Sequence, residues 1–380
     1  MIFLPDYALG IIKTLKGAGY EAYAVGGCVR DAVMGKKAVD VDITTSAKPD
    51  EILALFPRSA LTGGAYFTVT VLHGGGKAEV TPFRSEGGYS DSRRPDSVAF
   101  ATELAEDLKR RDFTINTLCF DGERIIDLLG GIDDINAKLI RCVGEPERRF
   151  SEDALRIMRA FRFSASLGFD IEQQTLAAAL ACSDGLRRIS VERIRDELIK
   201  LIFTPAPERL TPLLEHGALG FLKLGASPLL AHLNELPEDE NTRLAAFLDV
   251  CGRNAAELLK LPTKQKRFSR GVFAALDSFP PPETTAVKRI MSAYGAEVFL
   301  ASAIIAEKIH NKGAGCAALC REILKVGEPF EIRHLAIDGS DLLAAGVPET
   351  EIGAALTLAL DTVIDDPGSN TRDALLKPYK

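Results

Sequence analysis

Two aspartates that stand two residues apart, Asp40 and Asp42, are the residues of this sequence best suited to chemistry. They belong to a run with the composition of a strand, VDVDI, and positions i and i+2 of a strand face the same side. Both carboxylates are therefore expected to point together, while Val39, Val41 and Ile43 face a core. Neighbouring carboxylates repel unless a cation lies between them, and Mg²⁺ prefers oxygen ligands, so the pair predicts a magnesium site.

A glycine turn precedes the aspartates. The apolar run 22–25 ends at Gly26 and Gly27, whose bare backbone lets amide N–H groups approach a phosphate closely. Arg30 follows in the predicted first turn of a helix, where it can bind phosphate oxygens. Either motif alone is more often a plain turn or a solvated pair of carboxylates. On consecutive strands at this spacing, they predict a nucleotidyl-transfer site.

A second group of polar residues occupies a predicted helix at 150–163. Asp153, Arg156, Arg159 and Arg162 recur at steps of three, and each step turns about 300°, so they fan around half of the helix. The simpler interpretation is a solvated face with an Asp–Arg pair worth roughly a few tenths of a kcal/mol. The pattern alone favours this simpler interpretation, although three arginines that repeat without a carboxylate partner beside each of them weaken it.

An Asp/Arg pair could select a base without a template. Cytosine and adenine present an amino donor beside a ring-nitrogen acceptor, whereas uracil and guanine present a carbonyl acceptor beside an N–H donor. An ionised Asp only accepts hydrogen bonds and an Arg only donates them. The pair therefore fits C and A and leaves groups unpaired against U and G, at a cost of roughly 1–3 kcal/mol per group.

These residues need a small sheet early in the chain and helices after it. Residues 67–83 alternate around a glycine turn and predict a β-hairpin. Segment 84–98 has the polar composition of a mobile loop, with Arg93 and Arg94 at its centre as a solvated tip or an RNA contact. After residue 145 the pattern is nearly continuous helix. We therefore expect an α+β fold, a small mixed-sheet head followed by all-helical domains.

The composition is that of an ordinary globular protein, with 46% hydrophobic and 26% charged residues. No apolar run approaches the roughly 18 residues that span a bilayer, and the N-terminus lacks the pattern of a secretory signal. Seven scattered cysteines without a CxxC motif indicate reduced thiols, so a cytoplasmic protein is expected. The net charge of −7 argues against a large nonspecific nucleic-acid surface but allows a local basic path.

At these same residues the sequence resembles a known family. GGCVRD followed by DVDIT is similar to the signature of class II tRNA nucleotidyltransferases and bacterial poly(A) polymerases. EDALR at 152–156 resembles the EDxxR nucleotide-selecting motif of class II CCA-adding enzymes. The resemblance covers about residues 20–203 and includes DLKRRDFTIN and a neck-like block, ISVERIRDELIKLI. No His-Asp dipeptide occurs, so the HD phosphohydrolase domain of some bacterial relatives is not expected.

The resemblance implies an architecture and a reaction. The family's head, neck, body and tail are expected at 1–144, 145–204, 205–279 and 280–380. The implied reaction transfers CMP from CTP and then AMP from ATP to the 3′ end of tRNA and releases pyrophosphate. We expect the tail to bind tRNA, and we expect neither a membrane nor an obligate protein partner.

The resemblance also implies site residues. Asp40 and Asp42 match the family's catalytic, metal-binding pair and would hold two Mg²⁺ ions, with Glu79 or Asp112 as a candidate supporting carboxylate. The implied nucleotide-binding residues are Gly27, Arg30, Arg111, Asp153, Arg156, Arg159 and Arg162. Of these, Asp153 and Arg156 match the pair that reads the incoming base. For Arg111 the simpler alternative is an ion pair with Glu106 or Asp107.

Related proteins that share this head remain alternatives. A poly(A) polymerase would match the same motifs, although FTVTV and EVTPFR are more similar to the CCA-adding branch. A CC-adding enzyme characteristically has a shortened loop where this chain keeps residues 84–98, and an A-adding enzyme is a further alternative. An inactive RNA-binding module would be expected to lose Asp40 or Asp42.

Cations on the C-terminal helices are expected in part to follow the tRNA backbone; simple solvation is an equally good interpretation. These cations are Lys288, Arg289, Lys308, Lys312, Arg321 and Lys325.

Overall fold

The computed structural model describes residues 4–38, 40–62, 67–87 and 97–379. The chain divides into two compact units, Met1–Phe221 and Leu222–Lys380. The centre of the loop predicted at 84–98, including Arg93 and Arg94, lies outside the described residues. The boundaries of the head, neck, body and tail stay predictions.

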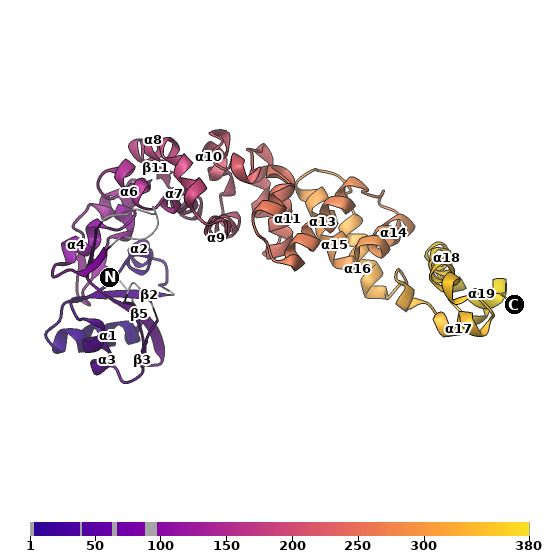
Figure 1. Cartoon of the computed structure of the whole chain (residues 1–380), viewed down its shortest axis with the longest axis horizontal. Coiled ribbons are helices and arrows are strands. Elements are labelled where there is room, and N and C mark those ends of the chain that lie inside the picture. The colour runs from indigo at the N-terminus through magenta and orange to yellow at the C-terminus, as the bar shows by residue number, and fades with distance from the viewer. Residues whose placement is uncertain (1–3, 39, 63–66, 88–96, 380) are drawn as a thin grey trace. The chain divides into compact units, whose positions relative to one another are not determined.

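A seven-stranded mixed sheet organises the first unit, in the order β3-β4-β5-β2-β1-β8-β9. β2 and β5 run parallel, and the other neighbouring strands run antiparallel. The predicted hairpin is confirmed as β4 and β5, and the prediction of a mixed-sheet head is confirmed with it (Figure 1). The strands are β1 (Ala22–Val25), β2 (Val41–Thr45), β3 (Ser59–Leu61), β4 (Val69–His73), β5 (Gly76–Pro82), β8 (Cys119–Phe120) and β9 (Ile125–Ile126). Two further pairs are β6 (Arg84–Gly87) with β7 (Ser97–Phe100), and β10 (Leu139–Ile140) with β11 (Asp170–Ile171).

One face of the sheet packs on α1 (Asp6–Gly17) and α3 (Pro49–Leu55) (Figure 1). Alternate residues of β4 and β5, such as Val71 and Val80, are fully buried there, and the helices bury Ile12, Leu15 and Ile52. This alternation is the pattern of a sheet with one face turned to the core.

The opposite face is partly covered by α4 (Leu104–Lys109). Leu108 of α4 forms an apolar cluster with Val25 of β1 and Cys119 of β8. Asp42 and Glu79 alternate onto this same face and remain exposed. The open part of the face therefore presents carboxylates beside a covered apolar part.

β2 begins later than predicted. Val41 and Ile43 are buried as expected, at 2% and 1% exposure, and Asp42 is exposed. Asp40, however, forms a bend directly before the strand, and Val39 lies outside the described residues. The placement of Asp40 within the strand is therefore wrong. Aspartate is a poor strand former, and the ladder to β5 starts only at Val41.

The single helix predicted at 150–163 is also wrong, because the chain breaks at Asp153 and Ala154 between α6 and α7. Asp153 has the extended angles φ −146° and ψ 103°, and its Oδ1 accepts the backbone N–H of Leu155 at 3.0 Å. An aspartate that satisfies a free N–H at a helix start competes with the continuous helix. The Asp and the Arg of the EDxxR-like motif therefore lie on different elements.

Helices make up the remainder of the first unit. They are α2 (Gly27–Val33), α5 (Gly131–Asn136), α6 (Pro146–Glu152), α7 (Leu155–Leu167), α8 (Gln173–Ala181), α9 (Val191–Ile202) and α10 (Thr211–Glu215), with the short 3₁₀ turn η2 (Thr114–Asn116).

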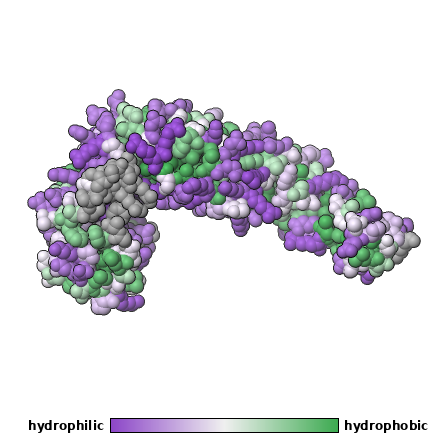
Figure 2. All heavy atoms as spheres, viewed as in Figure 1, coloured by the Kyte–Doolittle hydropathy of each residue, from purple (hydrophilic) through white to green (hydrophobic). Residues whose placement is uncertain are grey.

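The described residues of the second unit form helices and turns, as predicted. Val287, Met291, Phe299 and Ile323 belong to one buried cluster, and a second cluster lies around Leu342 and Val363. Hydrophilic and hydrophobic residues are interspersed over the face shown in Figure 2. Among the described residues, no helix is both long and apolar enough to cross a membrane. The helices are α11 (Glu240–Cys251), α12 (Ala255–Leu258), α13 (Thr263–Asp277), α14 (Thr284–Tyr294), α15 (Ala296–Lys308), α16 (Cys316–Val326), α17 (Gly339–Ala344), α18 (Ile352–Asp365) and α19 (Arg372–Leu376).

Candidate active site

Asp40, Asp42 and Glu79, here called the carboxylate cluster, lie where β2 and β5 run side by side. Asp42 stands opposite Glu79 in the parallel register, Asp40 precedes β2, and all are exposed. Although Asp42 keeps accessible surface, partial loss of hydration raises its pKa, and the charges of Glu79 and Asp40 raise that pKa further. Arg111 acts in the opposite direction. The cluster therefore places like charges beside a partly dehydrated carboxylate, and the charge of Arg111 offsets part of the effect.

The carboxylate cluster fits a magnesium ion that also binds a substrate. In the described part of the chain, no three or more His, Cys, Asp and Glu side chains form a group that could hold a metal. Mg²⁺ is commonly held by only one or two carboxylates together with substrate phosphates and water. Asp40 and Asp42 can supply that share, and a cation there would offset both the loss of hydration and the repulsion that raise the pKa of Asp42.

The glycine turn gathers backbone N–H groups and two arginines. Gly26 has φ +83°, a conformation that favours glycine. A Cβ atom at Gly26 would stand 3.4 Å from Nη1 of Arg111, and one at Gly27 would stand 3.5 Å from Nη2 of Arg30. Both guanidinium groups therefore lie against the turn. Donors converging on a bare backbone in this way suit the oxygens of a triphosphate.

Arg111 joins the turn to the carboxylate cluster. Its Nη2 donates to Oδ2 of Asp107 at 3.3 Å, so the ion pair considered as an alternative is present. Its Nε is buried and has no hydrogen-bond partner within the described residues. A buried unpaired N–H is costly. Nη1 of the same guanidinium, the atom that lies against Gly26, is the donor placed for a ligand at the turn.

A chain of hydrogen bonds leads from the turn to α7. Arg30 is buried, and its Nη1 donates to Oδ1 of Asn116 at 2.7 Å. Asn116 donates through Nδ2 to Oδ1 of Asp112 at 3.1 Å. Oδ2 of Asp112 accepts from Nε and Nη2 of Arg159 at 2.8 and 2.6 Å. Buried polar side chains thus link the glycine turn to Arg159 on α7, one of the predicted nucleotide-binding residues.

Asp112 is fully engaged in this chain. Burial alone would raise its pKa, but the charge of Arg159 and hydrogen bonds from Arg159, Asn116 and the N–H of Phe113 outweigh burial and lower the pKa to about 2. Both of its oxygens already accept protein donors. Of the two candidate supporting carboxylates, Glu79 is the one that lies beside Asp42.

Arg156, Arg159 and Arg162 on α7, here called the arginine row, all have carboxylate partners. The expectation that they lack such partners is wrong, because the partners come from α6, from the segment before η2 and from α9. Only Glu152 is close in sequence, four residues before Arg156. The ion pairs are Arg156–Glu152 at 2.6 Å, Arg159–Asp112 at 2.6 Å and Arg162–Glu197 at 2.5 Å.

Asp153 does not pair with Arg156. Its Oδ2 accepts from Nη2 of Arg193 on α9 at 2.8 Å, and Oδ1 receives the N–H of Leu155. Arg156 donates to the carbonyl of Arg110 at 3.1 Å in addition to its ion pair. The two predicted base-reading groups are therefore held by other protein groups. Arg193 lies in the neck-like motif, and its sequence position gave no sign of this contact.

Phe163 is a further residue that sequence reasoning missed. Its ring centroid lies 5.4, 5.3 and 4.2 Å from the Cζ atoms of Arg30, Arg159 and Arg162. An aromatic face attracts cations within about 6 Å, so the ring helps to hold arginines of both motifs together. In the sequence, only its position directly after Arg162 indicated that Phe163 could belong to the site.

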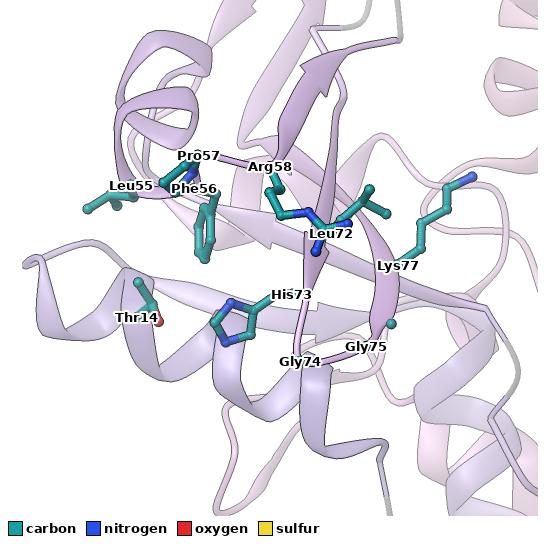
Figure 3. Close-up of a pocket in the computed structure, with 11 residues that line it drawn as sticks. Thr14, Leu55, Phe56, Pro57, Arg58, Leu72, His73, Gly74, Gly75 and Lys77 are labelled. Carbon is teal, nitrogen blue, oxygen red and sulfur yellow. The ribbon is translucent and has the colours of Figure 1, made fainter.

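A cavity of 620 Å³ lies apart from this set, at the turn between β4 and β5 (Figure 3). Phe56 and His73 line it and contact each other edge to face, with ring centroids 5.9 Å apart and an interplanar angle of 83° (Figure 3). None of the predicted site residues lines it. Its volume therefore says nothing about nucleotide binding at the carboxylate cluster.

Two family models match the chain. The one described as "Poly A polymerase head domain" matches residues 22–141, which include the carboxylate cluster and the glycine turn. The one described as "Probable RNA and SrmB- binding site of polymerase A" matches residues 168–230.

Similar proteins span the whole chain. A CCA-adding enzyme of Leuconostoc citreum is 39% identical, over 97% of this chain and 94% of the relative. One of Lactobacillus helveticus is 52% identical over 53% of this chain, and there the chain spans about half, 52%, of the relative's length. The crystal structure of the Bacillus stearothermophilus CCA-adding enzyme in complex with CTP superposes with a TM-score of 0.87 at 33% identity, covering 99% and 97% of the two chains.

Proposed function

The chain belongs to the family of CCA-adding enzymes, and from this membership we propose that it completes the 3′ end of tRNA without a template. In this reaction the tRNA 3′-hydroxyl oxygen forms a bond to the α-phosphorus of CTP, or in the last step of ATP. The bond from that phosphorus to pyrophosphate breaks, and the hydroxyl proton is released. Two rounds with CTP and one with ATP yield CCA.

The position of Arg111 is the observation that carries this proposal. Its Nη1 lies against the Gly26 turn, its buried Nε is unpaired among the described residues, and its charge acts on Asp42. Phosphate oxygens placed there would receive a donor that the protein leaves unused. They would also lie beside the carboxylates that attract a metal ion. A triphosphate satisfies both requirements at once.

We assign metal binding to Asp40 and Asp42, with Glu79 as the supporting carboxylate. Mg²⁺ held there supplies positive charge at the α-phosphate and favours loss of the hydroxyl proton. Arg30 and Arg111 orient the triphosphate against the glycine turn, so that its α-phosphate faces the cluster. Family membership supports a divalent metal, and the choice of Mg²⁺ follows from the oxygen ligands.

We assign base selection to Asp153 and Arg156, supported by Arg159 and Arg162. A carboxylate can accept about four hydrogen bonds, and Asp153 accepts three: one from the N–H of Leu155 and two from the guanidinium of Arg193. It can therefore accept one more hydrogen bond, from the amino group of C or A. The hydrogen-bond chain through Asn116 and Asp112 would keep this reading position fixed relative to the glycine turn.

The cysteines support a reducing compartment for this activity. All seven are free thiols in the structure, and six of them are buried. We accordingly infer a cytoplasmic location, where tRNA and nucleoside triphosphates are available.

The deciding experiment incubates the protein with a tRNA that lacks CCA and, separately, with a tRNA that ends in CC, each with CTP alone, ATP alone and both, and measures product length on a gel. On the tRNA that lacks CCA we expect two nucleotides with CTP, none with ATP alone and three with both. Addition that stops at two with both nucleotides indicates a CC-adding enzyme. Extension only of tRNA that ends in CC indicates an A-adding enzyme, and long products with ATP alone indicate a poly(A) polymerase. Binding without extension indicates an inactive module.

A further inference from the structure

A pair of aromatic rings, one of them exposed, lies beside the sheet that carries the carboxylate cluster, and the proposed reaction does not use it. The ring centroids of Phe67 and Phe100 are 5.2 Å apart, with an interplanar angle of 51°. Phe100, at the end of β7, is 42% exposed, and Phe67 is half-buried just before β4. A large apolar ring that keeps so much surface is available to a ligand.

The backbone of Phe67 is unusual. Its φ is +58°, in the left-handed region that residues with a side chain seldom adopt. Glycine would take this conformation freely, so a bulky ring here is not required by the turn. The left-handed residue interrupts the strand alternation directly before Thr68, and the Phe67 ring lies against Phe100. Unfavourable backbone conformations of this kind gather at functional sites.

The ring pair is connected to the carboxylate cluster through the sheet. Oγ1 of Thr68 lies 3.1 Å from Oγ1 of Thr81 on β5. Thr81 follows Glu79 by two residues, so it faces the same side of the sheet at roughly 7 Å along the strand. The aromatic pair therefore borders the face on which Asp42 stands.

We propose that Phe67 and Phe100 form a stacking surface for an unpaired base at the 3′ end of the RNA being extended. This inference rests on the proposed function, since it takes the RNA end as the occupant. The argument for that occupant is continuity with the carboxylate cluster, where the terminal hydroxyl must lie. Single-stranded RNA offers π-faces, and proteins bind such ends by stacking them on aromatic side chains. Stacking depends little on base identity, which suits an end that changes from one round to the next.

The test compares two ring-removing variants with two controls. Phe100→Ala and Phe67→Gly remove one ring each, and glycine at position 67 adopts the same φ freely, so folding is maintained. Phe100→Trp keeps a stacking face. Leu61→Ala removes another exposed apolar side chain, 52% exposed, from the neighbouring β3. Thermal unfolding of every variant is measured first, and the tRNA used lacks CCA.

Two readouts decide the outcome. We expect KM for tRNA to rise roughly 5- to 150-fold in both ring-removing variants, as for the loss of one base-stacking contact, with KM for CTP and kcat within about twofold. A 2-aminopurine at the RNA 3′ end should be quenched by the unmodified protein, by Phe100→Trp and by Leu61→Ala, but less by the ring-removing variants. Unchanged KM and quenching, or equal losses in Phe100→Trp or Leu61→Ala, would overturn the proposal.

The quenching assay also separates this inference from the proposed function. It needs only an RNA oligonucleotide and no nucleotide transfer. If the unmodified protein fails to extend tRNA but quenches the probe through these rings, the proposed activity fails and the stacking surface stands. If it extends tRNA and the variants are unaffected, the stacking surface alone fails.

Discussion

The carboxylate cluster and the arginine row are both dense in charge, but the protein satisfies them in opposite ways. Within the described residues, no cation forms an ion pair with the carboxylate cluster, and partial loss of hydration together with the neighbouring carboxylates raises the pKa of Asp42. Every member of the arginine row has a carboxylate within 2.6 Å. One region is electrostatically incomplete without a ligand, and the other is complete.

This difference suggests different roles for the carboxylate cluster and the arginine row. Carboxylates that repel each other can bind a cation and its polyphosphate at a small free-energy cost, because no ion pair within the protein has to break. The paired arginines cannot accept a new anion so easily, since they would leave a buried carboxylate behind. The arginine row is therefore suited to holding a fixed geometry. This contrast supports our proposal that catalysis takes place at the carboxylate cluster and base selection beside the arginine row.

The largest effect is expected from substitutions in the carboxylate cluster. Asp42→Ala, or Asp40→Ala, should lower both CMP and AMP transfer by about a thousandfold or more, because each removes a metal ligand at the reacting phosphate. Folding should be little changed, since both side chains are exposed. The measurement is kcat with saturating tRNA and Mg²⁺.

Asp133→Ala is the matched control, because it removes an exposed carboxylate from α5 without touching the cluster. Substantial transfer by either cluster variant would remove Asp40 and Asp42 from the catalytic assignment. A loss of transfer in the control as well would point to net charge rather than to metal binding.

The same contrast explains what the sequence could and could not predict. The strand alternation around Asp42, the hairpin of β4 and β5 and the bare Gly26 turn depend on neighbouring residues, so the pattern predicted them. The arginine pairs with Asp112 and Glu197 join residues 47 and 35 positions apart, which only the folded chain brings together. The helix break at Asp153 had a local cause, a side chain that satisfies a free N–H.

A second prediction tests whether the complete region reads the base. Asp153→Ala should lower the preference for C and A over U and G by about ten- to a hundredfold, as for the loss of one well-placed hydrogen-bonding group. The variant should still transfer nucleotide, since the carboxylate cluster is intact. The measurement is kcat/KM for all four nucleoside triphosphates.

Arg193→Ala supplies the comparison for this second prediction. Arg193 pairs with Asp153 at 2.8 Å, so removing it disturbs the same local structure while leaving the carboxylate in place. If Asp153 acts only by capping α7 and pairing with Arg193, the two variants should behave alike. If Asp153 reads the base, only Asp153→Ala should change the preference. An unmodified preference profile in Asp153→Ala would refute base reading.

A third prediction measures how strongly Asp112 supports the link between the glycine turn and the arginine row. Its pKa is lowered to about 2 in the folded protein from 3.8, so its ionised form stabilises the fold above about pH 4. That stabilisation is lost as the pH falls from about 4 to about 2. It amounts to about 2 kcal/mol by the usual conversion of a pKa shift.

Asp112→Asn removes the titration that produces this effect. The difference in free energy of unfolding between the unmodified protein and Asp112→Asn should therefore shrink by about 2 kcal/mol between pH 4 and pH 2. Urea unfolding across this range measures it, with Asp133→Asn as the control for removing an exposed carboxylate. A difference that stays constant with pH would show that Asp112 is not held ionised by Arg159.

The smallest effect is expected from the cations of the second unit. The structure divides these predicted tRNA contacts into cations that pair with a carboxylate and cations that do not. Lys288 is 1% exposed and paired with Glu328, and Arg289 pairs with Asp365 at 2.7 Å, so both have protein partners. Lys288 is therefore not available to tRNA, whereas Arg289 keeps an exposed side chain and its RNA contact stays a prediction. The remaining cations, Lys308, Lys312, Arg321 and Lys325, are exposed and form no ion pair in the described part of the chain.

Reversing charge at Lys308, Arg321 and Lys325 should therefore weaken tRNA binding severalfold at low salt and reduce the slope of log Kd against log salt by roughly one per lost phosphate contact. The matched variant Lys288→Met replaces a buried cation with an apolar side chain and should leave that slope unchanged, whatever it does to stability. Filter binding across a salt series measures both. An unchanged slope in the triple variant would mean that these exposed cations are only solvated. A charged side chain without a protein partner would then indicate a ligand site at the carboxylate cluster but not on the helices of the second unit.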